Sequence, residues 1–407
     1  MLPHVYRITK YDPRDRGDRG RFRGTEEAVG DHGPVEAACL DAVAAFAEAR
    51  GIGRLTIREP EAGTGIRFGA GHPVPGHGLA GLFPPDLAGY HDGAVVSLSV
   101  ALELVRAMLR ESGAWCRLEA EGEFAVHVGW DRCLYVGSNT VCEEAVARTR
   151  GLGLFAERVE GSPYDFEDDP DLVRRPADDD FWGLVRRSLG TLLLEETHAH
   201  NASRWHRLTP GNLESVRARL APRAMLAVWP DLFTDVPTAL RSLPDEGLAE
   251  ILREDADGRM CGTVVDMGVS EAVAASVAGA RAAAVVSLST DERHPLHTAV
   301  MPDQDGVLRA RWQTDPTPGD REWAFMSVLR PGQLVTGTVT AVADFGVTFV
   351  DLGGCTALIN LPELSHEPVG SPADAVRVGE TVTAEVVEVD LGRLRVSLSL
   401  KRVRTPD

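Results

Sequence analysis

Lysine is almost missing from this sequence: of its 42 basic residues only Lys10 and Lys401 are lysines. Together with abundant alanine and glycine, this scarcity indicates the coding bias of a GC-rich bacterial genome rather than a functional choice. The basic residues are also outnumbered by 61 acidic ones, which gives a formal net charge of −19. Such a charge excludes a protein that coats nucleic acid by bulk attraction, so any nucleic-acid contact must come from a local patch.

Long apolar runs, secretion signals and paired cysteines are absent as well. No run approaches the roughly 20 apolar residues that a membrane span needs, and the opening Met1–His4 lacks the basic and apolar regions of a signal peptide. The six cysteines are scattered without a CxxC pair, which favours reduced, buried thiols. We therefore expect a cytoplasmic protein with no membrane partner, and the length of 407 residues predicts two or three domains.

Recognisable catalytic motifs are missing too. The sequence contains no Gly-rich phosphate loop, GxSxG elbow or kinase signature, so we predict no catalytic residue, no cofactor and no bound metal. One alternative is a nuclease or modifying site at His198 and His200 with Glu195, although we expect a solvated helix end there. A second histidine cluster, in and after the Gly- and Pro-rich stretch 69–90, lacks a repeating ligand spacing. Its members are His72, His77, His91, Asp86 and Asp92.

Hydrophobic periodicity predicts a first mixed domain over residues 1–160. Helical patterns begin at Pro34 and again over 99–112, where apolar residues recur on one helix face. Three strand patterns separated by tight turns follow over 115–137, and a further helix over 141–150. This alternation indicates an α+β domain, for which the sequence suggests no activity.

An acidic linker and a second mixed domain are expected next. Glu160–Asp180 contains nine acids and two bases, a composition that predicts a linker over residues 161–180. Residues 181–325 then alternate helix and strand patterns, with helices expected over 181–197 and 238–253. We therefore predict a small α/β domain over 181–325.

Two weak signals for nucleic-acid contact lie in the first domain. The Arg- and Gly-rich segment 11–24 is similar to flexible RNA-contacting segments, but its interleaved aspartates favour a plain surface loop. Trp130 and Tyr135 could stack on bases if they were exposed, whereas packing within a hairpin core is the expected use.

The last part of the chain contains five short β-branched runs separated by Gly, Pro, Asp and Ser. The final run alternates apolar and polar residues, as a half-buried strand does. Five such strands leave no open edge if they close into a small barrel of the OB kind. The predicted fold is thus α+β and multidomain: two mixed α/β domains followed by a C-terminal five-stranded OB-fold β-barrel. The five runs lie near 334–341, 346–352, 355–361, 381–390 and 393–400.

Short motifs run through this segment in a fixed order: Pro331-Gly332, Gly337-Thr338-Val339, Asp344-Phe345-Gly346, Phe349-Val350-Asp351, Pro362-Glu363-Leu364-Ser365, Val378-Gly379-Glu380 and Ser397-Leu398-Ser399-Leu400-Lys401. In these motifs residues 329–402 resemble the S1 domain, the RNA-binding module of ribosomal protein S1, polynucleotide phosphorylase and several ribonucleases. The first two thirds of the chain resemble uncharacterised bacterial proteins that carry an S1 domain.

The resemblance implies that the barrel binds single-stranded RNA, alone or within the ribosome or another RNA–protein complex. Aromatic rings stack under unpaired bases and basic side chains hold phosphates in such sites. By resemblance, Phe345 and Phe349 are the stacking rings and Arg395 contacts phosphate. The alternative is that one of the two phenylalanine rings packs in the barrel core. The predicted RNA-binding residues are Phe345, Phe349, Asn360, Arg395, His366 and Lys401.

Three departures from the S1 pattern modify these expectations. Phe345 and Phe349 are one residue further apart than in the family, and we predict a β-bulge near Gly346 that restores their common face. Asn360 replaces a histidine, and the connection that contains His366 carries no lysine. Residues 329–407 hold seven basic and ten acidic residues, so we expect weak binding that salt reduces steeply.

Three functions therefore remain in view. The leading one is an RNA-binding protein in translation or RNA metabolism. The second is an RNA-processing enzyme with a site in the middle domain. The third is a protein-interaction adaptor whose barrel has lost RNA binding. Metal-dependent RNA cleavage would identify the RNA-processing enzyme. RNA binding without turnover would identify the RNA-binding protein.

Overall fold

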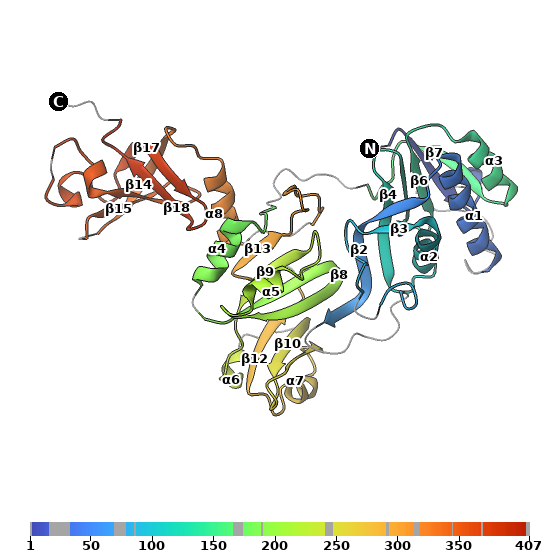
Figure 1. The fold of residues 1–407 in the computed structure, drawn as a ribbon, viewed down its shortest axis with the longest axis horizontal. Helices are drawn as coiled ribbons and strands as arrows, with labels where there is room; N and C mark the ends of the chain where they lie inside the picture. Colours follow the sequence, from blue (N-terminus) through green and yellow to red (C-terminus); the bar gives the residue numbers. More distant parts are fainter. Residues whose placement is uncertain are drawn as a thin grey trace.

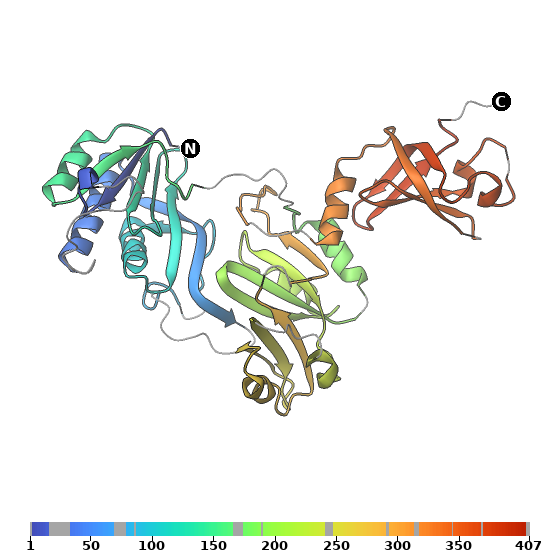
Figure 2. The same cartoon turned by 180° about the vertical axis from the view of Figure 1, so that it is seen from behind.

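The computed structural model describes residues 2–15, 33–68, 79–84, 87–165, 174–188, 190–240, 247–289, 293–312, 317–343, 345–367 and 369–403, with the backbone alone for 63–68. Most of the Arg- and Gly-rich segment 11–24, and His72, His77 and Asp86, lie outside these residues. Figure 1 shows an N-terminal region at one end, a middle region in the centre and the C-terminal barrel at the other end; Figure 2 gives the same arrangement from behind. Among the described residues, no helix is long and apolar enough to span a bilayer.

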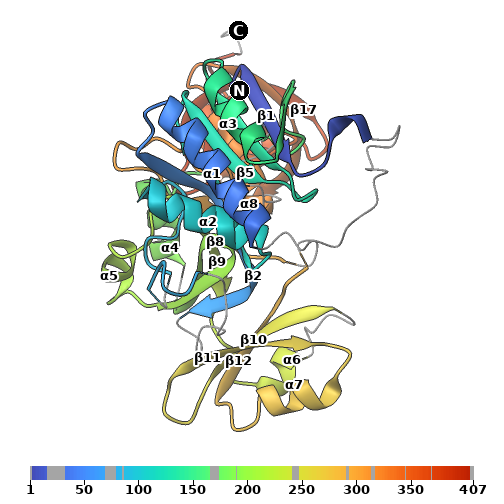
Figure 3. The ribbon, with the colours of Figure 1, turned by 90° about the vertical axis from the view of Figure 1, so that its right-hand side faces the viewer.

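The N-terminal region is a sheet covered by helices on one face. Figure 3 shows α1 (Pro34–Ala49), α2 (Leu98–Leu109) and α3 (Glu143–Gly151) gathered on the same side of this region. Apolar side chains from the strands and helices form one large core beneath them. The mixed α/β character expected from the sequence is confirmed. The strands are β1 (His4–Thr9), β2 (Arg54–Phe68), β3 (Val95–Ser97), β4 (Ala114–Ala120), β5 (Phe124–Val128), β6 (Leu134–Ser138) and β7 (Phe155–Val159).

The same sheet continues into the middle region. β8 (Leu192–Leu208), β9 (Met225–Pro230) and β13 (His297–Val300) extend it in the order β13-β9-β8-β2-β4-β5-β6-β1-β7, with β3 also paired to β2. The junction is a parallel pairing of β2 with β8, in which Glu61 lies opposite His200 and Phe68 opposite Arg204. One hydrogen-bonded sheet therefore crosses the segment that the sequence suggested as a domain boundary.

A second, three-stranded sheet completes the middle region. It contains β10 (Leu248–Glu254), β11 (Met260–Asp266) and β12 (Ala282–Ser287), with β10 in the centre. Trp205 and Trp229 of the large sheet share a buried cluster with residues of β10 and β12, so the two sheets pack together. The helices here are α4 (Asp179–Arg187), α5 (Leu213–Arg217), α6 (Val236–Leu240) and α7 (Ser270–Ser276).

Two of the helices expected in the middle region are wrong in their extent. The helix predicted over 181–197 ends at Arg187, and the helix predicted over 238–253 ends at Leu240. Residues 192–197 belong instead to β8 and residues 248–253 to β10, strands that have paired neighbours on both sides. Long apolar runs fit a fully buried strand as well as a helix, and pairing with distant strands decides between them.

The end of the predicted acidic linker is packed against the middle region. The Ala177 N–H donates to the Val300 carbonyl at 2.9 Å, and the Val300 N–H donates to the Arg175 carbonyl at 2.8 Å. The Arg175 side chain is only 2% exposed and lies 5.6 Å from the ring centroids of both Phe181 and Trp323. Residues 174–177 therefore lie against α4 and against α8 (Pro318–Ser327), the helix that precedes the barrel.

The C-terminal strands close into a barrel in the order β14-β15-β16-β18-β17. Its interior is apolar, and Met326 of α8 and Leu329 belong to the same core. Closure pairs every strand on both edges, which confirms the predicted five-stranded barrel. The strands are β14 (Leu334–Ala343), β15 (Val347–Asp351), β16 (Thr356–Asn360), β17 (Thr381–Asp390) and β18 (Arg395–Ser399), with short 3-10 helices η3 (Leu361–Glu363) and η4 (Pro372–Asp374) between β16 and β17.

A buried histidine on the helix-free face of the N-terminal sheet makes folding sensitive to acid. His127 on β5 is 3% exposed, and burial, reinforced by the nearby Arg117 guanidinium, lowers its pKa from 6.5 to about 3. Between those two pH values the unfolded chain binds a proton that the folded chain does not. His127 therefore lowers the free energy of unfolding as the pH falls below 6.5, by about 2 kcal/mol between pH 6.5 and 5.

Denaturant unfolding at several pH values, with His127→Gln beside the natural protein, measures this effect. The variant is expected to be less stable at pH 7 and to lose about 2 kcal/mol less than the natural protein between pH 6.5 and 5. An equal loss in both proteins would show that His127 is not held neutral by the fold.

Candidate nucleic-acid interface

The outer surface of β15, β16 and β18 presents a short row of side chains across three strands. Along β15 the buried side chains Thr348 and Val350 alternate with Phe349, which therefore points outward. Phe349 lies opposite Leu358 of β16, and Leu358 lies beside Ser397 of β18. We call this surface the strand face.

Phe345 projects from the turn between β14 and β15 and is 77% exposed. Gly346 follows it with φ +92°, a left-handed conformation that glycine adopts without strain, and the strand alternation begins only after it. The extra residue between the two phenylalanines is thus taken up in the turn, and Phe349 keeps its outward direction. Neither ring belongs to the described barrel core.

The β-bulge predicted near Gly346 is wrong in position. The pairing of β14 with β15 shifts between Val339 and Ala341, so Thr340 is the inserted residue. Ala341 then lies opposite Phe349, and its small side chain leaves that ring uncovered. A bulge in the partner strand, together with the glycine turn, makes a bulge in β15 unnecessary.

Asn360 and Lys401 lie at the same end of the barrel as Phe345. The Leu361 N–H, next to Asn360, donates to the Gly346 carbonyl at 2.9 Å, which holds the end of β16 against the turn that carries Phe345. The Lys401 N–H donates to the Glu363 carbonyl at 3.0 Å, so the residue after β18 lies beside η3. His366 is exposed in the connection between η3 and η4, outside the strand pairing.

Arg395 supplies a positive charge at the opposite edge of the strand face. It is exposed and opens β18 two residues before Ser397, on the same side of that strand. Within the described residues it forms no salt bridge, whereas Arg393 pairs with Asp390 at 3.6 Å and Arg402 with Glu385 at 2.9 Å. Strand geometry separates the backbone of Arg395 from that of Phe349 by about 12 Å.

The sequence reading missed two members of this surface, Leu358 and Ser397. Both could have been found from the two-residue alternation, since Leu358 stands two residues before Asn360 and Ser397 two after Arg395. They lie between the predicted aromatic and basic ends, so the strand face is continuous rather than two separate contacts.

The alternative site at His198, His200 and Glu195 does not assemble in the described structure. All three residues lie on β8, and alternation along a strand directs Glu195 to the face opposite the two histidines. His198 is buried, so the expected solvated helix end is wrong. The Glu195 carboxylate accepts from Ser203 Oγ at 3.0 Å and from Trp229 Nε1 at 3.3 Å. Its acceptor capacity is thus used within the core.

The second histidine cluster gives no metal site among the residues that can be described. Of its members His91 and Asp92 are visible, and the Asp92 carboxylate accepts from Arg58 Nε at 3.0 Å and from the Glu59 N–H at 2.9 Å. Across the described ranges, no group of three His, Cys, Asp or Glu side chains lies close enough together to hold a metal ion.

Comparison with known proteins places the family match on the barrel. The family model of the S1 RNA binding domain matches residues 328–401. The small ribosomal subunit protein bS1 of Mycolicibacterium smegmatis is 41% identical over 95 residues, which cover 23% of this chain and 20% of that protein. The bS1 protein of Staphylococcus saprophyticus is 30% identical over 180 residues, 40% of this chain and 44% of that protein.

A solved structure matches over the same limited extent. The solution structure of GSP13 from Bacillus subtilis is 28% identical, covers 19% of this chain and 62% of that chain, and gives a TM-score of 0.18. The chain spans from a fifth to less than half of the length of the two bS1 relatives. Motif order, barrel topology and family match agree on one segment: residues 328–401 are an S1 RNA-binding domain.

Proposed function

We propose that this protein binds single-stranded RNA on the strand face of its S1 barrel, with Phe345 and Phe349 stacking on bases and Arg395 and Lys401 neutralising phosphates. The observation that carries the proposal is the outward row from Phe349 through Leu358 to Ser397. The exposed Phe345 ring lies at one end of this row, and at the other end lies Arg395, which is exposed and has no salt bridge among the described residues. Stacking accepts any base because every base has an aromatic face, so we expect little sequence preference.

We further propose a cytoplasmic, non-catalytic role in translation or RNA metabolism. The support is the similarity of the barrel to small ribosomal subunit proteins, which suggests the ribosome or another RNA–protein complex as the setting. Asn360 and His366 extend the proposed contact as hydrogen-bonding groups. If the barrel instead binds a protein partner, it should not bind RNA. One RNA-binding experiment therefore distinguishes the two functions.

The salt dependence of RNA binding tests the charge part of the proposal. With Arg395 and Lys401 as the two phosphate contacts, the logarithm of the association constant should fall with the logarithm of salt concentration with a slope of about −1.4. Arg395→Ala should reduce the slope to about −0.7. Fluorescence anisotropy of a labelled single-stranded RNA, titrated with the full chain at several salt concentrations, measures both values.

Arg377→Ala is the matched control, because Arg377 is an exposed arginine of the same barrel that lies in the connection before β17, away from the strand face. It changes the net charge equally and should leave the slope near −1.4. Equal slopes for the two variants would assign binding to general charge rather than to the strand face. An absence of binding at low salt would favour a protein partner.

A further inference from the structure

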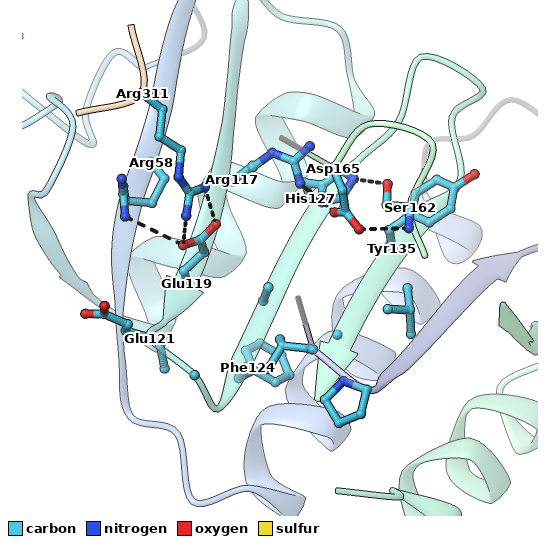
Figure 4. Close-up of a pocket in the computed structure, with 17 residues that line it drawn as sticks. Arg58, Arg117, Glu119, Glu121, Phe124, His127, Tyr135, Ser162, Asp165 and Arg311 are labelled. Atoms are coloured by element: carbon cyan, nitrogen blue, oxygen red, sulfur yellow. Dashed lines mark hydrogen bonds and ion pairs between the residues drawn. The ribbon is translucent and has the colours of Figure 1, made fainter. Parts of the chain in front are cut away.

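A pocket of about 370 Å³ lies far from the barrel, on the helix-free face of the N-terminal sheet (Figure 4). Its floor consists of outward side chains of β4, β5 and β6, including Arg117, His127 and Tyr135. Arg311 enters from the middle region, where it donates to Glu119 at 2.9 Å. The pocket is therefore built by both regions, and its volume falls within the roughly 300–1,000 Å³ of small-molecule sites.

One part of the pocket is flat and apolar. His127 and Tyr135 stack with ring centroids 5.4 Å apart and planes 11° apart. Ala125 and Gly137, paired across β5 and β6, line the same space and fill little volume. In Figure 4, His127 and Tyr135 lie beside Ser162 and Asp165, whereas Arg58, Glu119 and Arg311 form a separate group. A flat aromatic wall beside small residues fits a flat ring.

The polar part carries no net positive charge. The lining contains three arginines (Arg58, Arg117 and Arg311) and three carboxylates (Glu119, Glu121 and Asp165). Each arginine is already held by acids: Arg117 pairs with Glu59 at 3.0 Å and Asp165 at 3.2 Å, and Arg58 pairs with Asp92 at 3.0 Å. Because these guanidinium groups are paired, the site does not attract an anion, and an uncharged ligand fits it better.

A chain of hydrogen bonds fixes the direction of one donor in this pocket. Arg117 can only donate, so its contact at 3.3 Å makes His127 Nδ1 the acceptor. His127 is neutral, so Nε2 carries the remaining proton and donates to Ser162 Oγ at 2.8 Å. Ser162 Oγ also accepts the Tyr164 N–H at 3.2 Å. Its own hydroxyl proton has no acceptor among the described groups, although Ser162 is only 8% exposed and lines the pocket.

This direction excludes a nucleophilic Ser162, because a serine is activated by a histidine that accepts its proton, and here the histidine donates. The hydroxyl instead presents a buried donor that a ligand acceptor would satisfy. The Glu119 and Asp165 carboxylates offer acceptors in the same lining. A ligand that satisfies both kinds of group has donors and acceptors on one edge and flat apolar faces.

We propose that this pocket binds an uncharged heteroaromatic ring with a mixed donor and acceptor edge, a nucleobase, with Ser162 Oγ donating to a ring carbonyl or ring nitrogen. The base could belong to a free nucleoside or to an unpaired residue of RNA, which share this chemistry. The site is independent of the strand face, so it can be occupied whether or not the barrel binds RNA.

The test uses the full chain and the four common ribonucleosides, with inorganic phosphate as the negative probe, in calorimetric or ligand-observed NMR titrations. We expect at least one nucleoside to bind saturably and phosphate not to bind. Ser162→Ala should weaken binding about tenfold, the loss expected for one buried hydrogen bond. Ala125→Leu, which adds bulk between Glu119 of β4 and Gly137 of β6, should abolish it. Ser215→Ala on exposed α5 is the matched control and should change nothing.

A short single-stranded RNA then identifies the source of the base. In a chain with Phe345→Ala and Phe349→Ala, residual RNA binding that Ala125→Leu removes would show that the pocket accepts a base within RNA. Nucleoside binding without such residual RNA binding would show a site for the free compound. The proposal is overturned if no nucleoside saturates, if phosphate competes, or if both pocket variants bind as the natural protein does. None of these results depends on the strand face.

Discussion

Replacing Phe345 and Phe349 together by alanine is expected to lower the affinity for single-stranded RNA by at least about 30-fold. Each base stacked on an aromatic ring contributes about 1–3 kcal/mol, so two stacks contribute about 2–6 kcal/mol. Folding should be unaffected, because one ring projects from a turn and the other points outward from β15. Fluorescence anisotropy at low salt, where the weak interaction is easiest to measure, gives the two affinities.

Phe233→Ala provides the comparison, since Phe233 is an exposed phenylalanine of the middle region, distant from the barrel. It should leave RNA affinity within twofold of the natural value. If the double variant binds RNA as tightly as Phe233→Ala does, the strand face is not the RNA site. The single variants Phe345→Ala and Phe349→Ala then show how much of the lost RNA affinity each ring contributes.

Asp92→Asn is expected to destabilise the junction of the N-terminal and middle regions by about 3 kcal/mol. Asp92 is 2% exposed, and its carboxylate accepts from Arg58 and the Glu59 N–H in one region and from Arg223 at 3.3 Å in the other. Removing one member of a buried ion-pair network leaves charges without compensation, at a cost of about 3–5 kcal/mol. Arg223 keeps Asp303 at 2.8 Å, which favours the lower end of that range.

Hydrogen exchange of peptides on both sides of the junction, 54–62 and 297–312, measures this loss directly, because it does not require the whole chain to unfold in one step. Asp305→Asn makes the same chemical change in an exposed pair with Arg309, and it should cost less than about 1 kcal/mol. Similar exchange rates in the two variants would mean that the Asp92 network does not hold the regions together.

The barrel could be predicted from sequence because its information is local. Each strand carries its own alternation, and the motifs from Pro331 to Lys401 fix the turns between them. The outward direction of Phe349 also follows from alternation, once Gly346 is recognised as part of the turn. The bulge was misplaced because the register is set by both strands of a pair, and Thr340 of the partner strand supplied the extra residue.

The middle region could not be predicted to the same extent, because its strands are defined by distant partners. The run from Leu192 to Thr197 has the composition of a buried segment and becomes a strand only through its pairing with β9. The pocket lined by Ser162 could not be predicted from the sequence for the same reason. Arg311 and Glu119, which form an ion pair in its lining, are almost two hundred residues apart in the chain. No spacing rule connects residues so far apart.

The parallel pairing of β2 with β8 has a consequence for synthesis of the chain. β2 is complete at Phe68, yet its partner strand is complete only at Leu208, some 140 residues later. At a synthesis rate of about 5–20 residues per second, roughly 7–28 s pass between completion of β2 and completion of β8. During that interval the edge of β2 that will meet β8 exposes unpaired backbone amides and carbonyls, to which a strand of another chain could pair.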